Sequence, residues 1–153
     1  MIDELYSREI LRRATQLAHV GRLEAPDGAA DRTARLCGST IHVEVKLADG
    51  VITDFAQEVE ACALGQAAAA ILSQSVIGAP ITEVVAARDA MKAMLKGGEF
   101  AYPERFADFA ILQSVKDFPA RHASTLLALE ATVEAIRGKS PCDKNASEMV
   151  EGD

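Results

Sequence analysis

A run of alternating apolar and polar residues constrains the fold of this chain more than any other feature. Apolar residues take every second position from Ile41 to Leu47, an Asp49-Gly50 pair follows, and the alternation resumes from Val51 to Phe55. A period of two is typical of a strand with one buried face, and Asp-Gly is a preferred turn of two-residue hairpins. The segment therefore predicts an antiparallel β-hairpin with one face in solvent.

Helical patterns lie on both sides of this hairpin. Apolar residues recur near the 3.6-residue period, and Gly and Pro end each pattern. The expected helices cover residues 4–20, a segment from close to Cys62 to Gly78-Ala79-Pro80, and residues 81–95, 103–115 and 119–138. A loop with a tight turn at Pro26-Asp27-Gly28 is expected over 21–31, and a short strand over 33–37. Together these elements predict an α+β fold in which a small antiparallel three-stranded sheet packs against helices.

Length and composition fit one folded domain. The chain has 153 residues, of which 49% are hydrophobic and 25% charged, which is in the usual range for one domain. We place the domain at 1–138 and expect the polar, aperiodic segment 139–153 to be a disordered tail. We find no membrane-spanning run of about 18 apolar residues and no secretory signal at the amino terminus. We therefore expect a cytoplasmic protein with no membrane partner.

The net charge excludes one large class of partners. The formal net charge is −7 and the isoelectric point is near 5.0. Nonspecific nucleic-acid binding relies on clustered Lys and Arg that neutralise phosphates. Nucleic acid is therefore not an expected partner.

Three cysteines are the candidates for metal or sulfur chemistry: Cys37, Cys62 and Cys142. Cys37 follows the expected short strand and Cys62 opens the helix after the hairpin, so both can reach the same edge of the sheet. A thiol at a helix N-terminus faces unpaired N–H groups and the positive end of the helix dipole, which favour the reactive thiolate. Cys62 is therefore the better nucleophile candidate. Plain burial stays open as an alternative, because free cysteines are often buried and no CxxC pair is present.

The histidines and charged helix residues carry weaker signals. His122, near the start of the last helix, is either a metal ligand or an ordinary surface or cap residue. His19 and His42 are expected to be solvent-facing or structural. Cys142 lies in the expected tail, where a thiol is either incidental or reaches a metal from a mobile segment. The last set is interpreted as a solvated helix face: Arg88, Asp89, Lys92 and Lys96.

Several short motifs follow one another in the order of a known family. They are Leu5-Tyr6-Ser7, Cys37-Gly38-Ser39, Ala61-Cys62-Ala63-Leu64-Gly65-Gln66-Ala67, Phe118-Pro119-Ala120-Arg121 and Leu126-Leu127-Ala128. With the hairpin between them, they resemble the iron-sulfur cluster assembly scaffolds of the IscU, SufU and NifU amino-terminal family. The resemblance covers roughly Leu5 to Gly138 and is greatest to the SufU branch. It implies a SufE/NifU-like fold.

In the family that the chain resembles, three cysteines and an aspartate hold a nascent [2Fe-2S] cluster or a zinc ion. Cys37 and Cys62 match two of the cysteines, whereas Ser39 stands at the aspartate position and Ser124 at the third cysteine position. A serine hydroxyl is a hard, weakly acidic ligand that cannot replace a thiolate for a soft metal. His122, two residues before Ser124, would complete a Cys-Cys-His set, with the fourth position open or filled by Cys142 or a partner.

The resemblance implies three alternative functions. The leading one is a scaffold-like protein, not an enzyme in the turnover sense, which binds iron or a cluster through Cys37 and Cys62. It would accept sulfur from a cysteine desulfurase, serve apo iron-sulfur acceptor proteins, and act alone or as a homodimer. The second is a zinc-binding persulfide acceptor that uses Cys62. The third is a degenerate paralogue that has become a protein-binding subunit.

Overall fold

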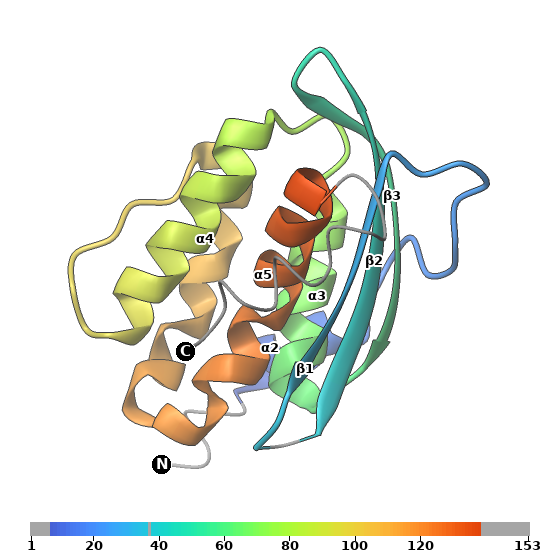
Figure 1. Cartoon of the computed structure of the whole chain (residues 1–153). Helices are drawn as coiled ribbons and strands as arrows, with labels where there is room; N and C mark the ends of the chain where they lie inside the picture. Colours follow the sequence, from blue (N-terminus) through green and yellow to red (C-terminus); the bar gives the residue numbers. More distant parts are fainter. Residues whose placement is uncertain (1–6, 37, 139–153) are drawn as a thin grey trace.

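The computed structural model describes residues 7–36 and 38–138 of the chain (Figure 1). Its helices and strands are α2 (Arg8–Ala14), β1 (Gly28–Ala34), β2 (Ser39–Ala48), β3 (Val51–Glu60), α3 (Ala63–Ser75), α4 (Ile81–Leu95), the 3₁₀ helices η1 (Glu104–Asp117) and η2 (Pro119–Arg121), and α5 (His122–Gly138). Within these described residues, no helix has the length and apolar character that a membrane span requires.

The three strands form one antiparallel sheet in the order β1-β2-β3. Ala48 pairs with Val51 at the end of the hairpin. Between them, Asp49 and Gly50 both have positive φ angles, 54° and 76°. Positive φ at both central residues is what a type I′ hairpin turn requires, and this turn matches the twist of the flanking strands. The predicted hairpin is thereby confirmed.

The helices cover one face of the sheet (Figure 1). α5 packs on β1 and β2, and α3 packs against α5. Val43 and Val45 of β2 and Leu129 of α5 have no exposed surface, so the core lies between the sheet and α5. The predicted α+β fold, with a three-stranded antiparallel sheet packed against helices, is confirmed.

The first helix is shorter than the predicted 4–20. Ser7 caps α2, and its hydroxyl accepts a hydrogen bond from the Ile10 amide at 3.3 Å. After Ala14 the chain runs to the outer edge of β3, where the Gly21 amide donates to the Gln57 carbonyl and the Gln57 amide donates to the His19 carbonyl, both at 2.9 Å. An unpaired strand edge leaves amide and carbonyl groups without partners, so pairing there replaces the last predicted helical turns.

β1 also begins earlier than predicted, because residues expected to form a loop pair with β2. The strand runs from Gly28↔Val45 to Ala34↔Ser39, whereas the sequence predicted a loop to residue 31 and a strand over 33–37. Residues 28–31, Gly-Ala-Ala-Asp, have low β propensity, and pairing with a strand far along the chain overrides it. The expected helix over 103–115 is 3₁₀ rather than α and extends to Asp117.

The charged positions of α4 do not form the expected solvated face. Arg88 is only 15% exposed and makes an ion pair with Glu130 of α5 at 3.0 Å. Lys92 is half-buried and lies 3.6 Å from the same carboxylate. Asp89 and Lys96 are exposed, as expected. The prediction was wrong for Arg88 because α5 packs beside this side of α4, whereas Lys92 keeps 42% of its side chain exposed.

His42 joins two carboxylates on the sheet surface and has a structural role. Its Nδ1 lies 2.7 Å from Asp31 Oδ1 and its Nε2 lies 2.8 Å from Glu44 Oε2. The Leu23 amide donates to Glu44 Oε1 at 2.7 Å. Burial raises the pKa of Glu44, but the hydrogen bonds from His42 and Leu23 and the charge of Arg22 outweigh it, and the pKa lies below its ordinary value of 4.5.

Glu44→Gln is expected to lower the free energy of unfolding by about 1 kcal/mol at pH 7, because the ionised carboxylate makes stronger hydrogen bonds. A lowered folded-state pKa gives stability that is present above the unfolded value and lost as pH falls through the folded value. The difference between the variant and the unaltered protein should therefore shrink below about pH 4.5. Urea unfolding from pH 7 to pH 3 measures it, with the exposed Glu60→Gln as control. A difference that does not change with pH would contradict this assignment.

Candidate sulfur and metal site

Cys62 lies at the N-cap of α3, as the sequence predicted. Its backbone is extended, with φ −66° and ψ 173°. The Gln66 amide donates to the Cys62 carbonyl at 2.8 Å and closes the first helical turn. The Cys62 side chain makes no capping hydrogen bond to this helix. The thiol is half-buried and lies where the amides of the first helical turn have no partners within the helix.

Two serines that are distant in sequence lie beside Cys62. Cys62 Sγ is 3.5 Å from Ser124 Oγ, and the Cys62 amide donates to Ser39 Oγ at 3.3 Å. Ser39 begins β2 and Ser124 lies in the first turn of α5, and they are 2% and 1% exposed. The structure therefore brings the thiol of Cys62 and the hydroxyls of both serine positions to one end of the sheet.

Gly65 permits the close approach that builds this site, although it is not among the site residues predicted from the sequence. A Cβ atom at Gly65 would lie 2.8 Å from the Ala61 Cβ and 3.3 Å from the Ser124 carbonyl oxygen. The first turn of α3 therefore touches the backbone of α5 beside Ser124. An isolated glycine in an otherwise alanine-rich helix is the signal that indicates such an approach.

The His122 side chain forms hydrogen bonds with backbone carbonyl groups that precede its helix. Its Nε2 lies 3.1 Å from the carbonyl oxygens of Val115 and Lys116. Carbonyl oxygens only accept hydrogen bonds, so Nε2 carries the proton and Nδ1 is the ring nitrogen that is left for a metal. The role of His122 as a metal ligand stays a prediction.

Cys37 and Cys142, and the predicted tail 139–153, lie outside the described residues. Next to the gap at position 37, the Gly38 amide donates to the Ala34 carbonyl at 2.8 Å. Leu36 is 79% exposed. The prediction that Cys37 shares the site with Cys62 therefore stays a prediction.

The side chains that the structure describes do not complete a metal site. In residues 7–36 and 38–138, no group of three or more His, Cys, Asp or Glu side chains is placed to hold a metal ion. Among the described residues, the donors beside Cys62 are its own thiol and the hydroxyls of Ser39 and Ser124, whereas structural zinc requires four thiolate, imidazole or carboxylate ligands. These donors fit a reactive thiol better than a closed metal cage.

Fold and site together define a class of protein. The chain is a small α+β domain in which a cysteine at the start of the helix after a β-hairpin faces the first turn of the last helix. It belongs to the family described as NifU-like N terminal domain, whose model matches residues 5–125. The resemblance inferred from the motifs is confirmed.

Named relatives and solved structures cover most of the chain. The iron-sulfur cluster assembly scaffold protein IscU of Thermotoga maritima is 26% identical over 133 residues, covering 87% of this chain and 93% of that protein. The zinc-dependent sulfurtransferase SufU of Bacillus subtilis is 25% identical over 135 residues, covering 88% and 91%. The crystal structure of a nitrogen-fixing NifU-like protein (N-terminal) from Brucella abortus is 48% identical, with a TM-score of 0.86 and coverage of 89% and 94%.

Proposed function

We propose that this protein is a scaffold-like component of iron-sulfur cluster assembly that accepts sulfur from a cysteine desulfurase at Cys62. The contact of Cys62 Sγ with Ser124 Oγ at 3.5 Å carries the proposal, because it puts a helix-terminal thiol at the end of the sheet. Relatives named as a scaffold and as a sulfurtransferase match along most of their length. We place the protein in the cytoplasm, with apo iron-sulfur proteins as the recipients of its cargo.

Sulfur transfer to Cys62 needs one accessible thiolate. The thiolate attacks the outer sulfur of the donor's persulfide, a new S–S bond forms at Cys62, and the donor's cysteine leaves as a thiolate. The transfer needs no added oxidant, because one S–S bond is formed and one S–S bond is broken. The first turn of α3 supplies the positive end of a helix dipole beside the attacking sulfur. The half-buried position of Cys62 leaves part of the residue open to solvent.

Iron, or a nascent [2Fe-2S] cluster, is the cargo in this proposal. Cys37 and Cys62 would hold it, with His122 as a third ligand through Nδ1. Because Ser39 and Ser124 offer hydroxyls, one copy would bind the cargo weakly. Two copies would together offer four thiolates from Cys37 and Cys62, which is the number that holds a [2Fe-2S] cluster. The need for four thiolates therefore favours a homodimer in the cluster-bound state.

A second function, a zinc-binding persulfide acceptor, is favoured by a different observation. Ser39 and Ser124 place hydroxyls beside Cys62; hydroxyls do not replace thiolates as ligands of a soft metal, whereas sulfur transfer needs only one thiolate. The relative from Bacillus subtilis is named a zinc-dependent sulfurtransferase. In this alternative Cys62 carries sulfur, and no cluster is assembled.

Mass spectrometry tests sulfur transfer. After incubation with a purified cysteine desulfurase and cysteine, the peptide that contains Cys62 is expected to gain the mass of one sulfur atom. Cys62→Ser should abolish this gain, and Cys142→Ser, which removes the tail thiol, should retain it. Absence of the gain in the unaltered protein would contradict sulfur transfer at Cys62.

Anaerobic reconstitution with iron and sulfide separates the two functions. A scaffold is expected to show cluster absorption that Cys37→Ala and Cys62→Ala each remove. A persulfide acceptor is expected to stay colourless while it still gains sulfur on Cys62. Protein that is colourless, free of metal and unmodified by the desulfurase would contradict both functions and would leave the degenerate protein-binding subunit.

A further inference from the structure

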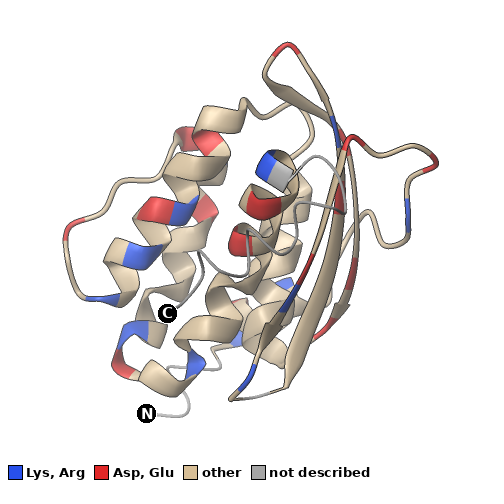
Figure 2. Ribbon diagram, in the orientation of Figure 1, with Lys and Arg blue, Asp and Glu red and all other residues tan. Residues whose placement is uncertain are grey.

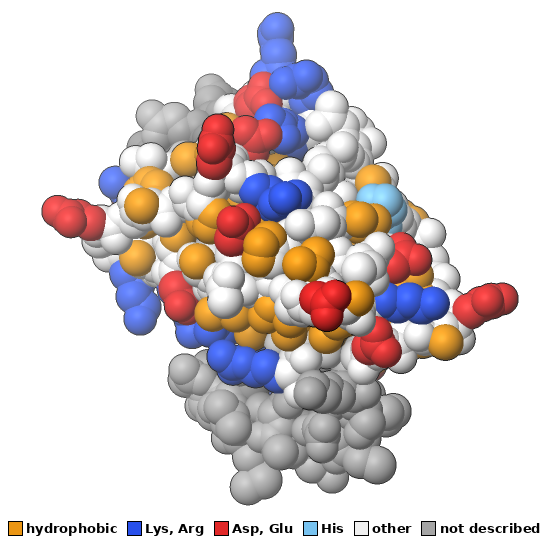
Figure 3. Space-filling view, turned by 90° about the horizontal axis from the view of Figure 1, so that it is seen from above, with side chains coloured by type: hydrophobic (Ala, Val, Ile, Leu, Met, Phe, Trp, Pro, Cys, Tyr) orange, Lys and Arg blue, Asp and Glu red, His pale blue; other side chains and the backbone are white. Residues whose placement is uncertain are grey.

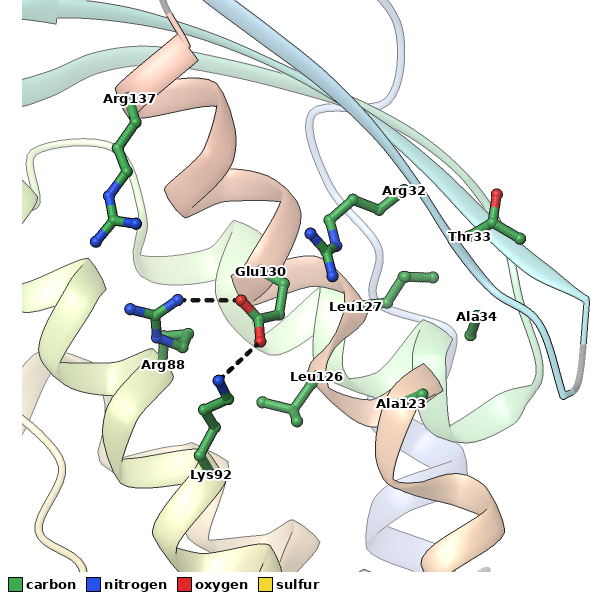
Figure 4. Close-up of a pocket in the computed structure, with 10 residues that line it drawn as sticks. All are labelled: Arg32, Thr33, Ala34, Arg88, Lys92, Ala123, Leu126, Leu127, Glu130 and Arg137. Carbon is green, nitrogen blue, oxygen red and sulfur yellow. Dashed lines mark hydrogen bonds and ion pairs between the residues drawn. The ribbon is translucent and has the colours of Figure 1, made fainter. Parts of the chain in front are cut away.

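A groove between β1, α4 and α5 gathers cationic side chains from three distant segments (Figure 4). Its volume is about 290 Å³. Among the described residues, its charged lining consists of Arg32, Arg88, Lys92 and Arg137, with Glu130 as the one acidic residue. Four cations and one anion among the described lining residues leave three positive charges in excess, before the pairs of Arg32 with Glu134 and of Arg88 with Asp89 are counted.

Part of this excess is neutralised by ion pairs. Arg88 donates to Glu130 at 3.0 Å and to Asp89 at 2.8 Å. Lys92 lies 3.6 Å from Glu130 and shares that carboxylate with Arg88. Lys92 therefore has a long contact with an acid whose other oxygen is already bonded.

Arg32 and Arg137, the other two cationic residues of the groove, differ in their ion-pair partners. Arg32 makes an ion pair with Glu134 at 3.1 Å. Arg137 is exposed and makes no ion pair or hydrogen bond with any other described residue. In Figure 4 its guanidinium points toward that of Arg88. Like charges that face each other repel, and an anion between them would remove this repulsion.

The positive lining of this groove contrasts with the charge of the chain as a whole. The whole chain has a net charge of −7. Acidic and basic residues are interspersed along the ribbon (Figure 2), and their side chains are interspersed on the face seen from above (Figure 3). A cleft lined mainly by cations raises the local concentration of anions, even in an acidic protein.

The lining of the groove also has an apolar part, which we call its floor. Leu126 and Leu127 line it, together with Ala34 and Ala123. Cationic groups over an apolar floor fit a ligand with an organic body and anionic ends better than a small hydrated ion. Ala123 precedes Ser124, and Ala34 pairs with Ser39. The floor therefore extends toward the site that contains Cys62.

We propose that this groove is a binding site for carboxylates of an organic acid, which contact Arg137 and Lys92 while the apolar part lies on Leu126 and Leu127. Guanidinium groups present parallel N–H donors that match a carboxylate. A free di- or tricarboxylic acid and an acidic segment of a protein share this chemistry. The proposal does not depend on sulfur transfer.

Isothermal titration with two ligands tests the proposal and distinguishes the sources. The ligands are tricarballylate and a blocked Glu-Leu-Glu-Glu peptide, each at low and high salt. Binding of tricarballylate assigns the groove to a small acid, and binding of the peptide alone assigns it to an acidic segment. Either result supports carboxylate recognition, and affinity should fall with salt because the contacts are partly exposed. No binding of either ligand at low salt overturns the proposal.

Two variants give opposite expected effects. The Lys92→Ala, Arg137→Ala double variant should weaken binding by about tenfold, as the loss of charge-assisted hydrogen bonds predicts. Glu130→Gln removes the one acid of the lining and should tighten binding, which a merely structural role of Glu130 would not do. Lys46→Ala, on a residue of β2 that does not line the groove, is the control and should leave affinity unchanged. Equal affinity in the double variant and the unaltered protein overturns the assignment.

Discussion

Ser124→Cys is expected to raise the affinity of this protein for Zn²⁺ by at least on the order of 100-fold. Loss of a residue that only orients a metal ligand typically costs about 10–100-fold in metal affinity, and a new direct ligand should have a larger effect. The reason is geometric, because Ser124 Oγ already lies 3.5 Å from Cys62 Sγ. Thiolate is a ligand that zinc prefers, and a serine hydroxyl is not. The substitution would give the site a second thiolate among the described residues. Competition with a chromophoric zinc chelator measures the affinity.

Ser75→Cys is the matched control for this gain. It adds a thiol at the last position of α3, the opposite end of the helix from Cys62. It should leave zinc affinity unchanged. A gain of equal size in both variants would show that any added thiol binds zinc, and an unchanged affinity in Ser124→Cys would show that the site does not assemble around Cys62.

Gly65→Ala is expected to lower the free energy of unfolding, although alanine is the better helix former. The helix propensity favours alanine by about 1 kcal/mol. The added Cβ would meet the Ala61 Cβ at 2.8 Å and the Ser124 carbonyl oxygen at 3.3 Å, and overpacking of this kind costs about 1–3 kcal/mol. Backbone atoms of α5 would have to move, so the overpacking term should prevail. Urea unfolding at neutral pH measures the difference.

Gly98→Ala makes the same chemical change where space is available. A Cβ atom there would meet only the Ala93 carbonyl oxygen, at an ordinary contact distance of 3.6 Å. This variant should be neutral or slightly stabilising, by up to about 1 kcal/mol through the unfolded state. If Gly65→Ala were as stable as Gly98→Ala, the close approach of α3 to Ser124 would not hold. The zinc affinity of Gly65→Ala should also change, because the backbone that would move belongs to Ser124, whose side chain contacts Cys62.

The hairpin and the start of α3 could be predicted from the sequence because both depend on local signals. Asp49-Gly50 between alternating residues specifies a turn whatever surrounds it, and the alanine-rich segment after Cys62 favours helix by propensity alone. The ends of α2 and β1 could not be predicted in the same way. They depend on pairing with Gln57 of β3 and with Val45 of β2, and a local window does not contain those partners.

The two sites likewise combine features that could be predicted from the sequence with features that could not. The motif around Cys62 identified the family, and the resemblance predicts that Ser39 and Ser124 stand at two of its ligand positions. That Ser124 contacts Cys62, and that Gly65 allows it, depends on how α3 packs against α5. The groove of Arg32, Lys92 and Arg137 left no sequence signal, because each charge by itself is typical of a solvated surface.

By itself, then, the sequence determined the family, the sheet with its hairpin, and the thiol at the start of α3. These features follow from residue periodicity, turn chemistry and a motif, all of which act over a few neighbouring positions. Only the tertiary structure decided which distant side chains meet: Cys62 with Ser124, and the cations of β1, α4 and α5 around Glu130. The physical reason is that such contacts are created by the burial of apolar faces between the sheet and the helices, which brings together residues that have no local influence on one another.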